Sequence, residues 1–207
     1  AFRPEPDVDS VRAAIAELAN AERPIIVAGG GVKVSGASAE LMELAETLQI
    51  PVATALNAKE TFPPDHPLAV GVPGSYSREC ANRAVSEADL VFFIGSHTGG
   101  QVTNEWRIPG PGTRVIQLDI NPAELGRSYP IAVGMQGDVK ASLRKMLLNI
   151  DVTPNESRST WAGHVQELVA NWHESVKDVA NSDAVPLRPE RLCTDLTNVL
   201  PGNSILV

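Results

Sequence analysis

A glycine-rich segment, VAGGGVKVSG (residues 27–36), offers the first chemistry in the chain, because exposed backbone amides after a strand can hold a phosphate. A dinucleotide fingerprint requires G-x-G-x-x-G at this place, and an acid at the end of the second strand for the ribose. Gly29 and Gly31 supply the first two glycines, but Val34 stands at the third position. The second strand ends in residues 54–57, TALN, with no acid. The segment is therefore not a standard dinucleotide turn.

The same segment also fails the pattern of a phosphate-binding P-loop, G-x-x-x-x-G-K-[ST]. Gly31 and Gly36 have the required spacing, but Ala37 occupies the position of the lysine that would reach the terminal phosphates. Two interpretations stay open for Gly29, Gly30 and Gly31. They form either a tight structural turn or a looser backbone cradle for a ligand.

A second glycine-rich loop, residues 94–106, follows another apolar strand and contains Gly95 and His97. In a doubly wound sheet, ligands bind outside the carboxyl ends of the strands, where the strand order reverses. If the two strands are neighbours, both glycine-rich loops face one crevice. Asp119 ends the next strand, where it could accept a hydrogen bond from a ribose hydroxyl or only cap a turn.

No catalytic or metal-binding constellation is predicted. The four histidines have no metal-ligand spacing, and only His97 is expected at a strand end in the crevice. There is no G-x-S-x-G elbow and no cysteine with an evident base, so nucleophilic catalysis has no support.

The elements that would position these residues alternate between strand and helix over the first 150 residues. Continuous apolar runs such as PIIVAG and DLVFFIG are typical of strands buried on both faces, and helical periodicity separates them. We expect an α/β fold: a doubly wound, mainly parallel, Rossmann-like sheet of about six strands with helices on both faces. Asn121, Pro122 and Glu124 predict a short helix with a reciprocal cap. The long Pro- and Gly-rich stretch 57–77 is either functional or holds a short strand at LAVG.

From residue 151 the pattern changes to polar breaks and helices with no following strand. We therefore expect residues 1–150 to form one α/β domain and residues 151–207 a helical arm or linker. The final residues, NSILV, read as the start of an apolar strand, which predicts a segment excised from a longer protein.

Composition excludes some classes of function. The net charge of −8 argues against a nucleic-acid binder, which needs a basic face. No apolar run approaches the ~20 residues that span a bilayer, so we expect no membrane partner. Two distant cysteines, Cys80 and Cys193, are typical of a cytoplasmic protein.

Several ordered blocks carry a resemblance to a known family. They are RPIIVAGGGV, ELAETLQIPVATAL, FPPDHPLAVGVPG, ANRAVSEADLVFFIGS, VIQLDINPAELGRSYP and GDVKASL. From about Arg23 to Leu148 the chain resembles the central domain of thiamine-diphosphate-dependent enzymes, of the acetolactate synthase and pyruvate oxidase type.

The resemblance implies a three-domain enzyme, with this chain in the middle and its tail leading to the third domain. The flanking domains of such enzymes hold thiamine diphosphate and Mg²⁺, so the chain alone is expected to be inactive, with a scaffold and dimerisation role. The whole protein would be a homo-oligomer, a dimer or tetramer, that cleaves or forms carbon–carbon bonds next to a carbonyl, acting on a 2-keto acid.

Some members of this family bind FAD in the central domain, and others bind ADP or nothing. The resemblance and the expected crevice together predict nucleotide contacts at eight residues. They are Gly29, Gly30, Gly31, Thr54, Gly95, His97, Asp119 and Asn121. The charged loop G-x-R-F-D-D-R of the FAD-binding synthases reads GSHTGGQ here (residues 95–101), so most charged contacts to a flavin nucleotide are missing. The alternative is an independent module that binds FAD, ADP or NAD.

Overall fold

The computed structural model describes residues 2–151 and 156–205. By its internal contacts the chain divides into two compact units, residues 1–169 and 170–207. The first unit holds the sheet and the candidate site, and the second holds short helices.

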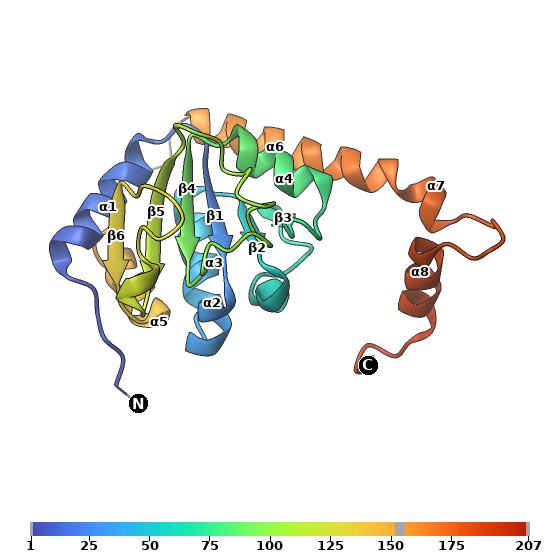
Figure 1. Ribbon diagram of the computed structural model, residues 1–207, viewed down its shortest axis with the longest axis horizontal. Coiled ribbons are helices and arrows are strands. Elements are labelled where there is room, and N and C mark those ends of the chain that lie inside the picture. Colours follow the sequence, from blue (N-terminus) through green and yellow to red (C-terminus); the bar gives the residue numbers. More distant parts are fainter. Residues whose placement is uncertain (1, 152–155, 206–207) are drawn as a thin grey trace. The chain divides into compact units, whose positions relative to one another are not determined.

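Six parallel strands form the sheet in the order β3-β2-β1-β4-β5-β6 (Figure 1). Their bounds are β1 Pro24–Ala28, β2 Val52–Thr54, β3 Ala69–Gly71, β4 Leu90–Ile94, β5 Arg114–Asp119 and β6 Val133–Gln136. The chain order reverses between β1 and β4, whose Val27 and Phe93 are paired in register. The predicted doubly wound parallel sheet is confirmed, and so is the short strand within LAVG.

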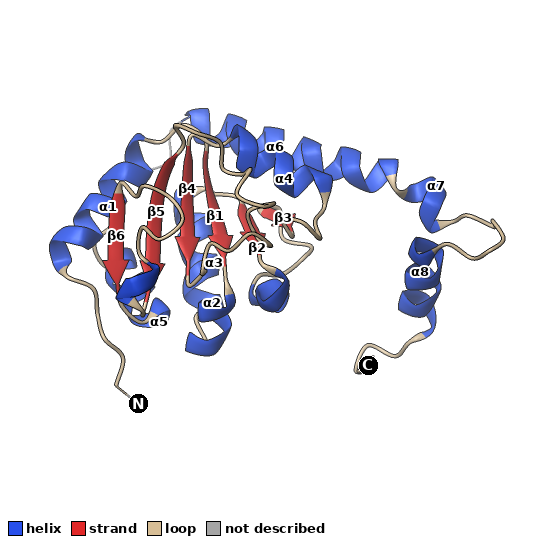
Figure 2. Cartoon of the chain, in the orientation of Figure 1, coloured by secondary structure: helices blue, strands red, loops and turns tan. Residues whose placement is uncertain are grey.

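Helices or 3₁₀ turns separate most of these strands in the chain, but residues 95–113, between β4 and β5, form a loop with turns (Figure 2). The helix bounds are α1 Val8–Asn20, α2 Gly30–Ser35, α3 Ser38–Leu48, α4 Glu79–Glu87, α5 Val139–Leu147, α6 Glu156–Ser175, α7 Lys177–Ala180 and α8 Pro189–Val199, with 3₁₀ turns η1 Leu56–Thr61 and η2 Pro122–Glu124. Side-chain caps begin α1 and α5, where the Asp7 and Asp138 carboxylates accept from first-turn amides.

After β1 the chain turns at Gly29, and α2 begins at Gly30. One local prediction differs from the structure. At η2, Asn121 Oδ1 accepts from the Ala123 amide as predicted, but Glu124 does not complete a reciprocal cap. Its Oε2 lies 2.9 Å from Arg127 Nη2 instead, because the ion pair is within reach one turn away.

The core lies against both faces of the sheet. Ile26, Phe92 and Ile116 join one cluster with the apolar stripes of α1, α3 and α5. The intervening residues point to the other face, where α4 contacts β3. All five residues of β1 and of β4 are buried, which explains why these strands read as continuous apolar runs.

The first half of α6 belongs to the first unit. Trp161 is 3% exposed, and its Nε1 donates to the carbonyl of Pro24, the first residue of β1, at 2.9 Å. Arg158 donates to carbonyls of α1 and α3, and Val165 is also buried. The compact first unit thus extends beyond residue 150, where we expected the linker to begin. The division at residues 150 and 151 stays a prediction.

The second unit consists of α7, α8 and the end of α6, and no residue of α7 or α8 is buried. Arg191 on α8 pairs with Asp195 and Asp183. Residues 203–205 form no strand, and residues 206–207 of the expected strand lie outside the described residues, as do residues 152–155 of the predicted linker.

Candidate functional site

A cavity of about 730 Å³ opens at the carboxyl edge of the sheet, where the strand order reverses. Its walls come from the segments that follow β1, β2, β4, β5 and β6, with Pro73 from the segment after β3. This is the position at which open α/β sheets bind ligands. We call this cavity the crevice.

Six of the eight predicted contact residues line the crevice: Gly29, Gly30, Gly31, Gly95, His97 and Asp119. Thr54 does not, because it shares a face of β2 with Val52 and both line a separate cavity of about 210 Å³. Asn121 lines neither cavity and is exposed at the start of η2.

The glycines bring the ends of β1 and β4 into contact. The Gly29 amide donates to the Ile94 carbonyl at 2.8 Å, and the Gly31 amide donates to the Gly95 carbonyl at 3.0 Å. A Cβ on Gly29 would lie 2.3 Å from Gly95 O, and one on Gly31 would lie 2.7 Å from Gly95 Cα. Two of the three glycine amides are therefore used within the fold, which supports a structural turn at Gly29 and Gly31.

Gly30 faces the crevice in a different way. A Cβ there would lie 2.8 Å from Asn57 Nδ2, so the side chain of Asn57 approaches the start of α2. Asn57 itself lines the crevice. It was not among the predicted contacts, although it follows the second strand just as Asp119 ends the fifth.

The charges in the crevice are mostly paired. Asp119 is 5% exposed, and its Oδ1 accepts from the Asn121 amide at 2.9 Å, which is the turn-capping alternative. Lys33 forms an ion pair with Glu60. The His97 side chain is exposed, and its carbonyl accepts from Arg127 Nη2 at 2.8 Å. These contacts leave little positive charge for an anionic ligand.

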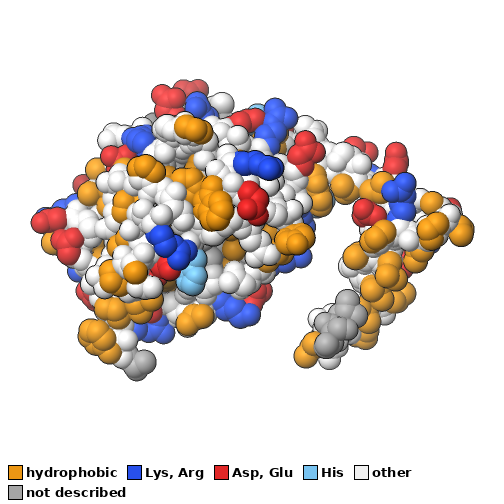
Figure 3. All heavy atoms as spheres, in the orientation of Figure 1, with side chains coloured by type: hydrophobic (Ala, Val, Ile, Leu, Met, Phe, Trp, Pro, Cys, Tyr) orange, Lys and Arg blue, Asp and Glu red, His pale blue; other side chains and the backbone are white. Residues whose placement is uncertain are grey.

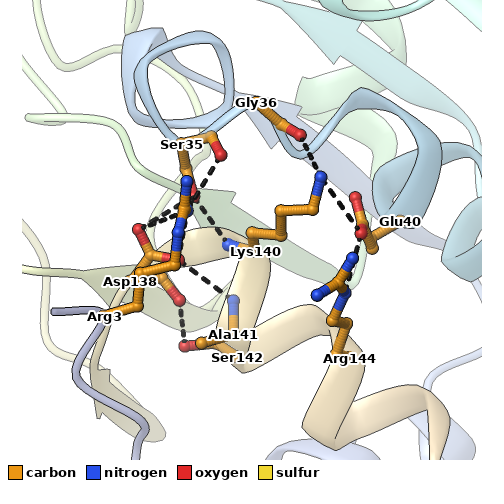
Figure 4. A network of polar contacts seen from close by, with 9 residues as sticks. All are labelled: Arg3, Ser35, Gly36, Glu40, Asp138, Lys140, Ala141, Ser142 and Arg144. Carbon is orange, nitrogen blue, oxygen red and sulfur yellow. Dashed lines mark hydrogen bonds and ion pairs between the residues drawn. The ribbon is translucent and has the colours of Figure 1, made fainter. Parts of the chain in front are cut away.

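Asp138 lines the crevice and was not among the predicted contact residues. Figure 4 shows it between the N-terminal segment and α5. Its carboxylate accepts from Arg3 Nη1 at 2.8 and 3.0 Å, from Ser35 Oγ at 2.9 Å and from the Ala141 amide at 3.1 Å. Its place directly after β6, at the carboxyl edge, was the signal that could have identified it.

A second part of this network joins α3 to α5 (Figure 4). Glu40 is 7% exposed, and its Oε1 lies 2.9 Å from Arg144 Nε and 3.5 Å from Lys140 Nζ. Lys140 also donates to the Gly36 carbonyl at 2.9 Å, at the end of α2. Together these contacts join α2, α3 and α5.

The pKa of Asp138 lies below its ordinary value. Burial raises it, but the hydrogen bonds from Arg3, the Ala141 amide and Ser35 outweigh burial. A depressed carboxyl pKa stabilises the fold above the ordinary value of 3.8 and loses that contribution as the pH falls through the lowered pKa.

Replacing Asp138 with asparagine is therefore expected to lower stability at pH 7 and to have a smaller effect at pH 2. Asparagine keeps a helix cap of similar strength, so the difference isolates the charge. Urea unfolding midpoints of both proteins at pH 7 and pH 2 measure it. Asp65→Asn, at an exposed loop position, is the control. An equal loss at both pH values would contradict the interpretation.

The face in Figure 3 shows acidic and basic side chains interspersed among apolar ones. In the part of the chain that the structure describes, no three His, Cys, Asp or Glu side chains form a group that could hold a metal ion. None of the described helices is long and apolar enough to cross a bilayer.

Comparison with known proteins identifies the family. The family model "Thiamine pyrophosphate enzyme, central domain" matches residues 11–146. A Methanocaldococcus jannaschii protein named "Probable acetolactate synthase large subunit" is 39% identical over 183 residues, which is 88% of this chain and 30% of that protein. The acetolactate synthase large subunit of Corynebacterium glutamicum is 32% identical over 83% of this chain and 28% of its own length.

A solved structure agrees with these sequence matches. A Mycobacterium smegmatis protein assigned to the thiamin diphosphate-dependent enzymes superposes with a TM-score of 0.62 and 29% identity, over 76% of this chain and 30% of that one. The chain thus spans about a third of the length of the relatives that it matches. The matched residues contain all six strands and the whole crevice, and this chain belongs to the thiamine pyrophosphate enzyme family as a central domain related to that of acetolactate synthase.

Proposed function

We propose that this chain is the scaffold of a larger thiamine-diphosphate enzyme that cleaves or forms carbon–carbon bonds next to the carbonyl of a 2-keto acid. The observation that supports the proposal most directly is the match of residues 11–146 to the central-domain family, together with relatives named as acetolactate synthases. In the proposed enzyme, flanking domains of the same polypeptide hold thiamine diphosphate and Mg²⁺. When bound there, thiamine diphosphate would supply carbanion stabilisation.

The proposed role of the domain is to join the cofactor domains and to take part in a homodimer or homotetramer in the cytoplasm. The residues of the crevice have a structural role in this proposal, as in the hydrogen bonds of Asp138. We assign none of them a catalytic step. The comparisons give no support to an independent nucleotide-binding module.

A polypeptide that contains this chain and its flanking domains is expected to consume pyruvate or a related 2-keto acid when thiamine diphosphate and Mg²⁺ are present. The 207-residue chain alone should show no turnover under the same conditions. Substrate consumption measured with and without the cofactor tests the proposal. An extended polypeptide that binds thiamine diphosphate but converts no 2-keto acid would refute the proposed substrate class.

We also propose that the crevice does not hold FAD. The diphosphate of a dinucleotide needs amide donors or cations, yet Gly29 and Gly31 donate to carbonyls and Lys33 pairs with Glu60. These contacts agree with the loss of the charged flavin-binding loop at residues 95–101.

Adding FAD or ADP at 1 mM to the purified chain is therefore expected to leave its melting temperature unchanged within about 1 °C. A ligand of the native state at 100 times its Kd would stabilise it by about 2.7 kcal/mol, which such a melting experiment resolves easily. A dose-dependent rise with either nucleotide would show that the crevice is a nucleotide site.

A further inference from the structure

The separate cavity of about 210 Å³ lies at the carboxyl ends of β2 and β3, and we call it the edge pocket. Thr54, which sequence reasoning placed in the crevice, lines the edge pocket. Leu56 lines both cavities, so the two are neighbours. The function proposed above assigns no role to the edge pocket.

The edge pocket has an apolar floor and a basic rim. Val52, Phe62 and Val72 are buried and form part of its wall. Lys59 and Arg78 also line it, and no carboxylate is found among its lining residues. The chain as a whole carries eight more acidic than basic groups, and the crevice contains Asp119 and Asp138. The lining of the edge pocket thus carries basic groups without the carboxylates that line the crevice.

The side chain of Arg78 lies across the end of β3. A Cβ on Gly71 would stand 2.7 Å from Arg78 Cδ and 3.3 Å from its Nε, so the glycine makes room for this side chain. The Arg78 amide donates to the Val72 carbonyl at 2.9 Å, which holds the residue at the start of α4. The Arg78 side chain therefore lies beside the end of β3, and its backbone is held at the start of α4.

The volume limits what can enter. At about 30 Å³ for each water molecule, 210 Å³ holds on the order of seven waters, which corresponds to a ligand of six or seven non-hydrogen atoms. An apolar floor with cations at the rim matches a short branched chain that ends in a carboxylate, because guanidinium groups bind carboxylates with paired hydrogen bonds. We propose that the edge pocket binds a small branched organic acid, with its apolar part on Val52, Phe62 and Val72 and its carboxylate at Lys59 and Arg78.

Two probes of the same shape test this proposal on the 207-residue chain. 2-Methylpropanoate and 2-methylpropanamide have equal numbers of non-hydrogen atoms, but only the first carries a charge. Titration followed by the amide NMR signals of Gly71 and Ser77 should give saturable shifts with a Kd of about 1 mM for the acid. Binding of the amide should be at least about ten-fold weaker, since hydrogen bonds to charged groups are the stronger ones.

Substitutions of the two basic residues test which of them binds the carboxylate. Arg78→Met is expected to weaken acid binding about ten-fold or more, and Lys59→Met, at an exposed position, about three-fold. Arg12, on α1, lines neither cavity, so Arg12→Met should leave the Kd of the acid unchanged. Because Lys59 is exposed, its substitution remains informative if the Arg78 variant does not fold. Equal affinities for acid and amide, shifts that do not saturate by 20 mM, or an unchanged Kd in both variants would overturn the proposal.

Discussion

Replacing Arg158 with methionine is expected to lower the free energy of unfolding by about 3 kcal/mol. The guanidinium is 2% exposed and donates to the carbonyls of Leu18, Ala21 and Leu48. These carbonyls belong to the carboxyl-terminal ends of α1 and α3, where backbone acceptors have no partner within their helix and the dipole favours a cation. Methionine would leave three buried acceptors without donors. The substitution also removes the desolvation penalty of the buried charge, but this gain offsets only part of that cost.

Urea unfolding followed by far-UV circular dichroism measures this effect. Arg158→Lys is expected to lose less, about 1–2 kcal/mol, because an ammonium keeps the charge but not the planar set of donors. Arg12→Met is the matched control, since Arg12 is exposed on α1 and pairs with the exposed Asp9. If the methionine variant loses less than about 0.5 kcal/mol of unfolding free energy, the hydrogen bonds of Arg158 to α1 and α3 do not anchor the first half of α6.

Replacing Gly29 with alanine should cost about 3 kcal/mol, at the upper end for overpacking. Gly29 has φ −103° and ψ −177°, an extended conformation that alanine adopts without strain. The obstacle is space, because the new Cβ would lie 2.3 Å from Gly95 O and 2.7 Å from Ser96 Cα. Both neighbours are backbone atoms, so a change of rotamer cannot relieve the contact and β1 would have to separate from β4.

Gly99→Ala provides the control in the facing loop. A Cβ at Gly99 meets nothing within 4 Å, and this glycine is not in the left-handed region. Its substitution is expected to change stability by less than about 0.5 kcal/mol, or to stabilise slightly through the unfolded state. Thermal unfolding of both variants and of the parent chain measures the two changes in stability. Similar melting temperatures for the two variants would show that the contact between Gly29 and Gly95 is not tight.

Local sequence signals predicted the elements well. The apolar runs at 24–28 and 90–94 became strands buried on both faces. The helical periodicity between them became helices such as α3, with Leu41, Leu44 and Leu48 on its buried face. These patterns depend on the spacing of apolar residues along short stretches of the chain, which the sequence shows directly. The alternation of strands and helices then predicted the parallel doubly wound sheet, because right-handed crossovers leave few other topologies.

The candidate site was predicted less completely. The rule that ligands bind at the carboxyl edge predicted that Gly29, Gly95 and Asp119 would lie together, and all three line the crevice. Their contact with a ligand stays a prediction. Thr54 lines the edge pocket and not the crevice, because the face to which a residue at the end of a three-residue strand points depends on register. The rule did not include Asp138, which lines the crevice and caps α5.

The sequence by itself determined the fold class, the location of the crevice and the family, since each depends on patterns along the chain or on ordered motifs. Only the tertiary structure decided what the glycines do. Whether Gly29 and Gly31 offer their amides to a ligand depends on what stands opposite them, and this is the backbone of residues 94–95, more than sixty residues away in the chain. In the same way, only the folded chain shows that Arg158 meets the ends of two helices that precede it by more than a hundred residues. Hydrogen-bond partners across such distances in the chain are set by packing, which no local pattern encodes.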